Sequence, residues 1–109
     1  MRFSGPVPER FEREYGCSVP EWMQWLPIAA GGNRLTVGAG VAEVDLNAAA
    51  LGANPQPVLV IAWQPLEPRR IALLAISRLH VRFEFSATTQ AQRQEFMRHF
   101  DLTMQRGGG

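Results

Sequence analysis

The chain has 109 residues, of which 46% are hydrophobic and 19% are charged, and its formal net charge is +1. This composition predicts one globular domain spanning residues 1–109 and excludes a highly charged, disordered chain. The longest apolar runs, residues 58–63 and 71–76, have six residues each. A membrane-spanning helix needs about twenty, so we expect no membrane partner.

Sequence features also bear on location. No apolar stretch of secretory-signal length follows Arg2, and the single cysteine, Cys17, cannot form an internal disulfide. We therefore expect a cytoplasmic protein. All eleven Lys/Arg positions are arginine, which indicates codon bias in a GC-rich bacterial genome. Residues 1–68 carry a charge of about −3 and residues 69–109 about +4, which favours an anionic partner or two mutually attracting faces in a dimer.

Helix signals occur twice near the N-terminus. Residues 8–15 begin with a proline, carry acids in the opening turn and stop at Gly16, so we predict a short helix there. Ser18 and Glu21 have capping-box spacing and predict a second helix that ends at Leu26, before Pro27.

Strand signals follow. Residues 35–46 predict one strand, in which Gly38 and Gly40 indicate a bulge or a close backbone approach. Residues 47–57 predict an alanine-rich loop or a single helical turn. The apolar residues 58–63 and 71–76 predict a central hairpin connected through residues 65–68 and covered on both faces.

Strict alternation begins at residue 79 and predicts a strand with four inward side chains, namely Leu79, Val81, Phe83 and Phe85. The pattern leaves open whether residues 71–85 form one bent strand or a hairpin. Thr89 and Gln92 then predict a capping box for a C-terminal amphipathic helix, and Gly107 is placed to cap its end.

Together these elements predict an α+β fold. It would have two short N-terminal helices, a mostly antiparallel sheet of three to four strands, and a C-terminal amphipathic helix packed on that sheet.

The sequence carries no signature that names a reaction, so we expect a non-catalytic protein without cofactor or metal. Gly38 and Gly40 lack the helix and the third small residue of a dinucleotide-binding loop. Cys17 has no histidine near it in sequence, and His80 and His99 stand nineteen residues apart without metal-ligand spacing.

The R-x-x-x-R spacing of Arg78 and Arg82 resembles the arginine motif of PilZ-class receptors for cyclic dinucleotides. In that family an Asp or Asn, a Ser and a Gly follow the arginines across a strand, and nothing after Arg82 matches them. The activity is therefore not carried over.

The C-terminal sequence from Arg106 to Gly109 resembles the tail of ubiquitin-like and sulfur-carrier proteins. That resemblance implies a carrier working through its terminal glycine after a final strand. The residues before this tail are predicted to form a helix, and a helix-capping glycine is the alternative interpretation.

Our first functional hypothesis is an interaction or accessory protein that contacts a protein partner or forms a homodimer. Its basis is the second predicted helix, where Trp22, Met23 and Trp25 crowd about two turns. Tryptophan is enriched at interface hot spots. The alternative is that both indoles are core residues between helix and sheet.

A second hypothesis is an anion-binding surface. Arg78, His80 and Arg82 alternate along one strand and would share one face, and Arg69 and Arg70 could widen that patch. Such a row suits a phosphate backbone or an anionic small molecule, with weak and salt-dependent nucleic-acid binding. The alternative is a solvated face whose cations pair with Glu9, Glu12 and Glu14.

Overall fold

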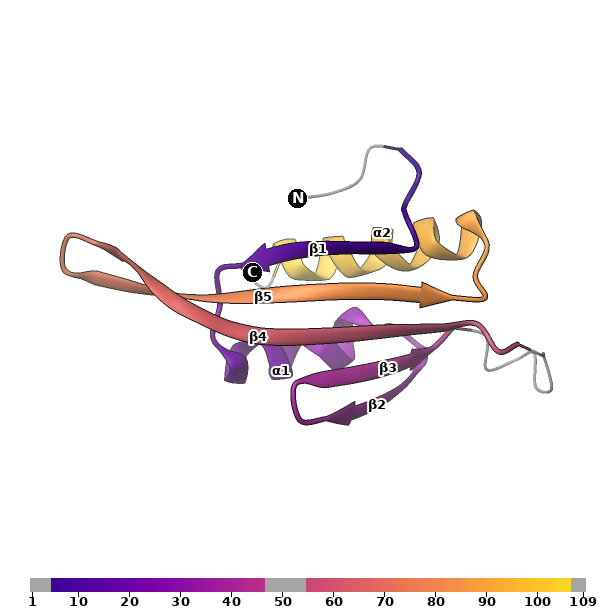
Figure 1. The fold of residues 1–109 in the computed structure, drawn as a ribbon, viewed down its shortest axis with the longest axis horizontal. Coiled ribbons are helices and arrows are strands. Elements are labelled where there is room, and N and C mark those ends of the chain that lie inside the picture. Colours follow the sequence, from indigo (N-terminus) through magenta and orange to yellow (C-terminus); the bar gives the residue numbers. More distant parts are fainter. Residues whose placement is uncertain (1–4, 47–54, 107–109) are drawn as a thin grey trace.

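A computed structural model describes residues 5–46 and 55–106. They form a five-stranded antiparallel sheet with two helices on one face, an α+β arrangement (Figure 1). In chain order the elements are β1 (Arg10–Tyr15), α1 (Val19–Ala29), β2 (Arg34–Gly38), β3 (Val41–Asp45), β4 (Val58–Ile71), β5 (Leu74–Ser86) and α2 (Gln90–Arg106). The strand order is β1-β5-β4-β3-β2. The prediction of two N-terminal helices and a three- to four-stranded sheet is therefore wrong.

The first predicted helix is in fact strand β1, which pairs antiparallel with β5. Phe11, Arg13 and Tyr15 point to the helix-covered side, while Glu12 and Glu14 point to the other. This alternation has a period of two, as a strand requires. The sequence does not show this alternation of apolar and polar residues, because the inward position 13 is occupied by a charged arginine that is buried in the fold.

The second predicted helix exists as α1 and begins with the expected capping box. The Ser18 side chain accepts a hydrogen bond from the Glu21 amide at 3.3 Å, and the Glu21 carboxylate accepts one from the Ser18 amide at 2.9 Å. The helix continues past Pro27 to Ala29, so its predicted end at Leu26 is wrong. Burial of Ala29 against the core holds this last turn in place.

The single strand predicted over residues 35–46 is a hairpin of β2 and β3. Gly40 lies in its turn with φ +73°, a backbone conformation that favours glycine. The two glycines therefore mark a reversal of the chain and not a bulge. The loop predicted at residues 47–57 falls largely outside the described residues.

The β4–β5 hairpin turns later than predicted. The chain passes through residues 65–68 in strand conformation and reverses at Ala72 and Leu73. Residues 71–85 therefore contain this reversal followed by β5. Residues 71–76 were expected to be covered on both faces, and they are exposed instead.

Strand β4 contains two prolines, and each lies where pairing with a neighbouring strand is interrupted. The Trp63 amide donates to the Gly40 carbonyl at 3.0 Å, on the β3 side of the strand. Pro65 lies two residues further along, so its nitrogen faces the same side, where no described strand follows. Pro68 lies in the irregularity of the ladder between Leu66 and Arg69. Proline is compatible with free edges and bulges.

Helix α2 begins with the predicted capping box of Thr89 and Gln92, with bonds of 2.8 and 3.1 Å. Its predicted cap at Gly107 lies outside the described residues. The helix packs on the sheet face that carries the predicted inward residues of β5, all of which are buried. The resulting core also contains Trp22, Trp63, Phe96, Met97, Phe100 and Met104.

Candidate interaction surface

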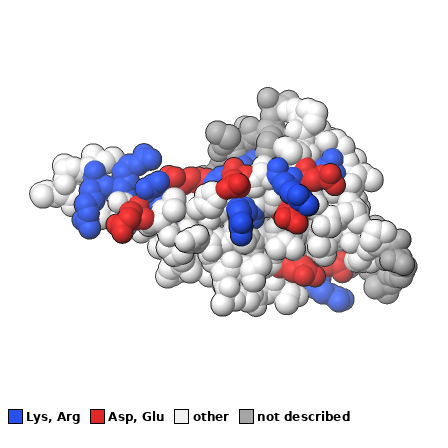
Figure 2. Space-filling view, in the orientation of Figure 1, with Lys and Arg blue, Asp and Glu red and all other residues white. Residues whose placement is uncertain are grey.

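One face of the sheet is covered by neither helix, and we call it the open face. It carries the even-numbered residues 10–14, 58–66 and 78–86, together with the odd-numbered residues 41–45. In Figure 1 this face is turned to the viewer and both helices lie behind it. Figure 2 shows basic and acidic side chains interleaved across it.

The predicted basic row lies on the open face, where β1 supplies carboxylates to two of its three members. Arg78 donates to both Glu14 oxygens at 3.0 and 2.8 Å, and His80 Nε2 lies 2.6 Å from a Glu12 oxygen. The hydrogen bonds from Arg78 lower the pKa of Glu14 below its ordinary value. These contacts match the alternative interpretation of the row, with the acids on a strand in place of a helix.

Arg82, the third member, borders a shallow hollow of about 300 Å³ that Glu12 and Glu84 also line. Glu84 pairs with Arg10 across 3.8 Å. An anion placed beside Arg82 would therefore meet two carboxylates. The open face is charge-balanced here and does not form a basic patch.

An apolar stripe runs along β4 through the middle of the open face. Val58, Val60 and Ala62 are partly exposed. Their neighbours on the flanking strands are mostly polar or charged, namely Asp45, Glu43 and Val41 on β3 and Ser86, Glu84 and Arg82 on β5. A central apolar stripe with polar borders is the arrangement found in protein–protein interfaces.

Beyond the rest of the sheet, β4 and β5 continue as a two-stranded ribbon, residues 66–78, which we call the arm. β1 pairs with β5 only as far as Leu79, and β3 pairs with β4 only up to Ala62. In Figure 1 the arm projects from the left side of the sheet. An isolated hairpin of this kind is marginally stable in water, so a partner that covers it would add stability.

Apolar side chains at the end of the arm are exposed. Leu73 in the turn is 102% exposed, Leu74 is 66% exposed and Ile71 is 52% exposed. Ile71 pairs with Leu74, and Arg69 pairs with Ile76. Because paired residues share one side of a ribbon, these four side chains lie on the side continuous with the open face. Arg70 lies on the opposite side, so the arm is amphipathic.

The three residues of α1 that were predicted to form an interface differ in their exposure. Trp22 is fully buried and makes tilted or edge-on ring contacts with Tyr15, Trp63 and Phe100. Its indole is not available at the surface. Met23 and Trp25 are partly buried at the edge of the core, so an interface at these two residues stays a prediction.

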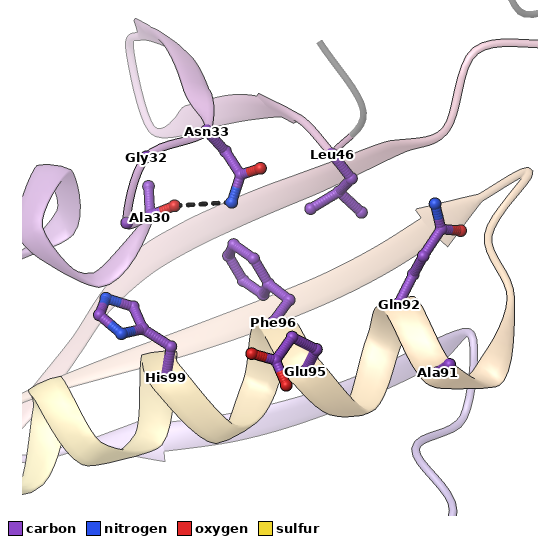
Figure 3. Close-up of a pocket in the computed structure, with 10 residues that line it drawn as sticks. Ala30, Gly32, Asn33, Leu46, Ala91, Gln92, Glu95, Phe96 and His99 are labelled. Carbon is purple, nitrogen blue, oxygen red and sulfur yellow. Dashed lines mark hydrogen bonds between the residues drawn. The ribbon is translucent and has the colours of Figure 1, made fainter. Parts of the chain in front are cut away.

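A larger hollow of about 510 Å³ lies on the helix side between the end of α1 and α2 (Figure 3). His99 Nε2 donates to the Ile28 carbonyl at 3.0 Å, and Asn33 Nδ2 donates to the Ala30 carbonyl at 2.9 Å. Glu95, on the same rim, is paired with Arg98. These polar groups are engaged with the protein itself and do not form a nucleophile–base pair.

Cys17 is buried, and burial raises the pKa of its thiol to about 11. Such a thiol is a poor nucleophile at neutral pH. Within residues 5–46 and 55–106 there is no group of three or more His, Cys, Asp or Glu side chains able to hold a metal ion. None of the helices in the same ranges is long and apolar enough to cross a membrane.

No known protein-family model matches this chain, and no curated protein matches it significantly. The arm was missed in the sequence because its apolar residues were assigned to a covered hairpin. Pro65 and Pro68 are the signal that could have revealed it, since two prolines in a continuous strand require a free edge and a bulge.

Proposed function

We propose that this chain is a non-catalytic protein-interaction module that contacts its partner through the arm and the open face. The observation that carries the proposal is the exposure of Ile71, Leu73 and Leu74 on a ribbon that projects from the sheet. Exposed apolar clusters of this kind mark interaction sites. The partner we consider first is a second copy of the chain.

Burial of the apolar side chains at the tip of the arm would not by itself give a stable complex. Full burial of one leucine or isoleucine side chain contributes about 1.5–3 kcal/mol, whereas association costs at least about 4 kcal/mol in lost freedom. Three such residues at the tip offset that cost but leave little surplus. The stripe of Val58, Val60 and Ala62 on the open face supplies the further apolar area that a stable complex needs.

The charge pattern favours a protein partner over a nucleic acid. On the open face, Glu14 and Glu12 of β1 contact Arg78 and His80, and Glu84 lies against Arg10. A phosphate backbone gains affinity from cations without carboxylate neighbours, and these basic residues each have one. The carrier hypothesis is also less well supported, because α2 runs to Arg106 where a carrier would have a final strand.

A cytoplasmic location in a bacterium is part of the proposal. The cytoplasmic location is supported by the single, buried cysteine. The bacterial origin is supported by the use of arginine at every Lys/Arg position.

The test compares the wild-type chain with Leu74→Asp by multi-angle light scattering over a wide concentration range. Leu102→Asp is the matched control, because Leu102 is an exposed leucine on α2, 37% exposed. We expect self-association that Leu74→Asp abolishes and Leu102→Asp preserves. In parallel, each form is cross-linked in a cell extract, to score whether any captured protein depends on Leu74.

Two results would contradict the proposal. One is equal association of all three forms. The other is a monomeric wild-type chain that captures no protein in an arm-dependent way.

A further inference from the structure

We propose that two copies of this chain pack their open faces together about a two-fold axis that passes by Gln64 and His80. Each arm would then lie over the far end of the other copy's sheet. The inference rests on the proposed function and specifies the arrangement of the partner.

The register of β4 and β5 places three residue pairs of this face on either side of the Gln64–His80 pair. The first pairs on the two sides of Gln64–His80 are Leu66 with Arg78, toward the arm tip, and Ala62 with Arg82. Counted toward the arm tip, the second pair on this face is Arg69 with Ile76, and the third is Ile71 with Leu74. Counted the other way, the second level places Val60 between Glu43 and Glu84. The third places Val58 beside Asp45 and Ser86.

A two-fold axis at this pair exchanges the two ends of the face. The basic level of the arm, with Arg69, then meets the acidic level that holds Glu43 and Glu84. The apolar level of the arm, with Ile71 and Leu74, meets Val58. The same rotation sets Arg78, which is paired with Glu14, opposite Arg82, which shares a hollow with Glu12. Each of these correspondences is made twice in the dimer.

Charge complementarity is the argument for a second copy as the occupant. On the side continuous with the open face the arm carries Arg69, together with Arg78 that is paired with Glu14. The opposite end of the open face carries Glu43 and Asp45, together with Glu84 that is paired with Arg10. Figure 2 shows several basic side chains on the projecting arm, with acidic side chains beside them. Arg69 is 61% exposed, and its ion pair with Glu14, at 3.8 Å, is longer than a hydrogen bond. We therefore expect Arg69 to exchange this contact for one with Glu43 of the other copy.

The dimensions also fit. The molecule measures 53 × 30 × 21 Å, and the open face is its broad side (Figure 1). A standard interface buries about 800 Å² per partner, which such a face can hold. Two twisted antiparallel sheets pack face to face at about 10 Å with strands within about 30° of each other. Packing of this kind would cover the apolar stripe of β4 and support each arm.

The test is a charge exchange between Arg69 and Glu43. Arg69→Glu and Glu43→Arg should each weaken dimerisation roughly tenfold or more, because each places like charges opposite one another. The double variant Arg69→Glu/Glu43→Arg should recover most of the wild-type affinity. Affinities are measured by sedimentation at low salt, after circular dichroism confirms that each variant is folded.

The matched control is Arg70→Glu, alone and combined with Glu43→Arg. It makes the same change of charge at the neighbouring residue, but on the side of the arm that faces away from the open face. We expect no rescue of Glu43→Arg by this substitution. Rescue by Arg69→Glu and not by Arg70→Glu supports the antiparallel arrangement.

The remaining outcomes separate this inference from the proposed function. A wild-type dimer whose affinity is unaffected by Arg69→Glu, or not rescued by the exchange, overturns the arrangement while the interaction function stands. A wild-type chain that stays monomeric at every concentration overturns the second copy as partner. In that case arm-dependent capture of another protein decides the proposed function.

Discussion

Arg13 of β1 and Asp101 of α2 form a buried ion pair that joins the first strand to the last helix. Arg13 Nη2 donates to Asp101 at 3.3 Å and Nη1 makes a shorter bond to the same carboxylate. Both side chains are almost fully buried, at 6% and 5% exposure. The guanidinium also lies over the rings of Phe11 and Phe83, 5.3 and 5.8 Å from their centroids.

Removing one partner of this pair should be severe. We expect Asp101→Asn to lower the free energy of unfolding by about 3–5 kcal/mol, because the Arg13 charge would stay buried without its counter-ion. Urea denaturation measures the loss. The control is Glu95→Gln, which removes the exposed pair with Arg98 and should cost less than about 1 kcal/mol. Similar losses of unfolding free energy for the two variants would show that the buried pair stabilises the fold no more than the exposed pair does.

Two alanines with positive φ predict gains in stability. Ala72 in the arm turn has φ 54° and Ala87 between β5 and α2 has φ 56°. Glycine relieves the strain of this conformation, so each substitution to glycine should stabilise its segment by up to about 1 kcal/mol. Ala87→Gly should raise the urea midpoint of the whole domain. Ala72→Gly should mainly slow hydrogen exchange in the arm, because an outlying ribbon opens locally.

If Ala72→Gly shifts the global midpoint as much as Ala87→Gly does, the arm unfolds together with the domain. That result would contradict its description as a separately opening ribbon.

Tyr15 gives an alkaline transition that can be followed directly, because the chain has one tyrosine. Burial raises its pKa from the ordinary 10.0 to about 12. The unfolded chain therefore loses this proton first, so the stabilising contribution is intact below pH 10 and is lost as the pH rises to 12. Tyrosinate absorbance in the near ultraviolet should titrate near pH 12 in the folded protein. Titration near pH 10 before unfolding would contradict the buried position.

Cys17 should react slowly in the native protein. Its side chain is 2% exposed, and its pKa is raised to about 11 by burial and by the nearby charge of Glu21. At pH 8 we expect little labelling by a thiol reagent until urea unfolds the chain. Rapid labelling under native conditions would instead indicate an open N-terminus of α1.

Much of the covered half of the fold was predictable from local patterns. The alternation from Leu79 to Phe85 and the capping boxes at Ser18 and Thr89 are confirmed. These features were predictable because each depends only on residues close together in the sequence. β1 was missed because Arg13 is buried by a partner 88 residues away. No local pattern shows that a charged residue will be paired in the core.

The candidate surface was predictable only in part. The row of Arg78, His80 and Arg82 was placed correctly on one strand face, but its pairing with Glu12 and Glu14 depends on the register of β1. The arm was not predicted because apolar content alone does not distinguish a strand that is covered on both faces from an exposed ribbon. Only the topology shows that neither β1 nor β3 extends beside it.

The most direct test of the central claim is hydrogen–deuterium exchange of the wild-type chain at concentrations well below and well above its association midpoint. We predict that protection rises with concentration in residues 66–78 and 58–62, while peptides from α2 stay unchanged. Protection gained on α1 or α2, or no change at any concentration, would contradict association through the arm and the open face.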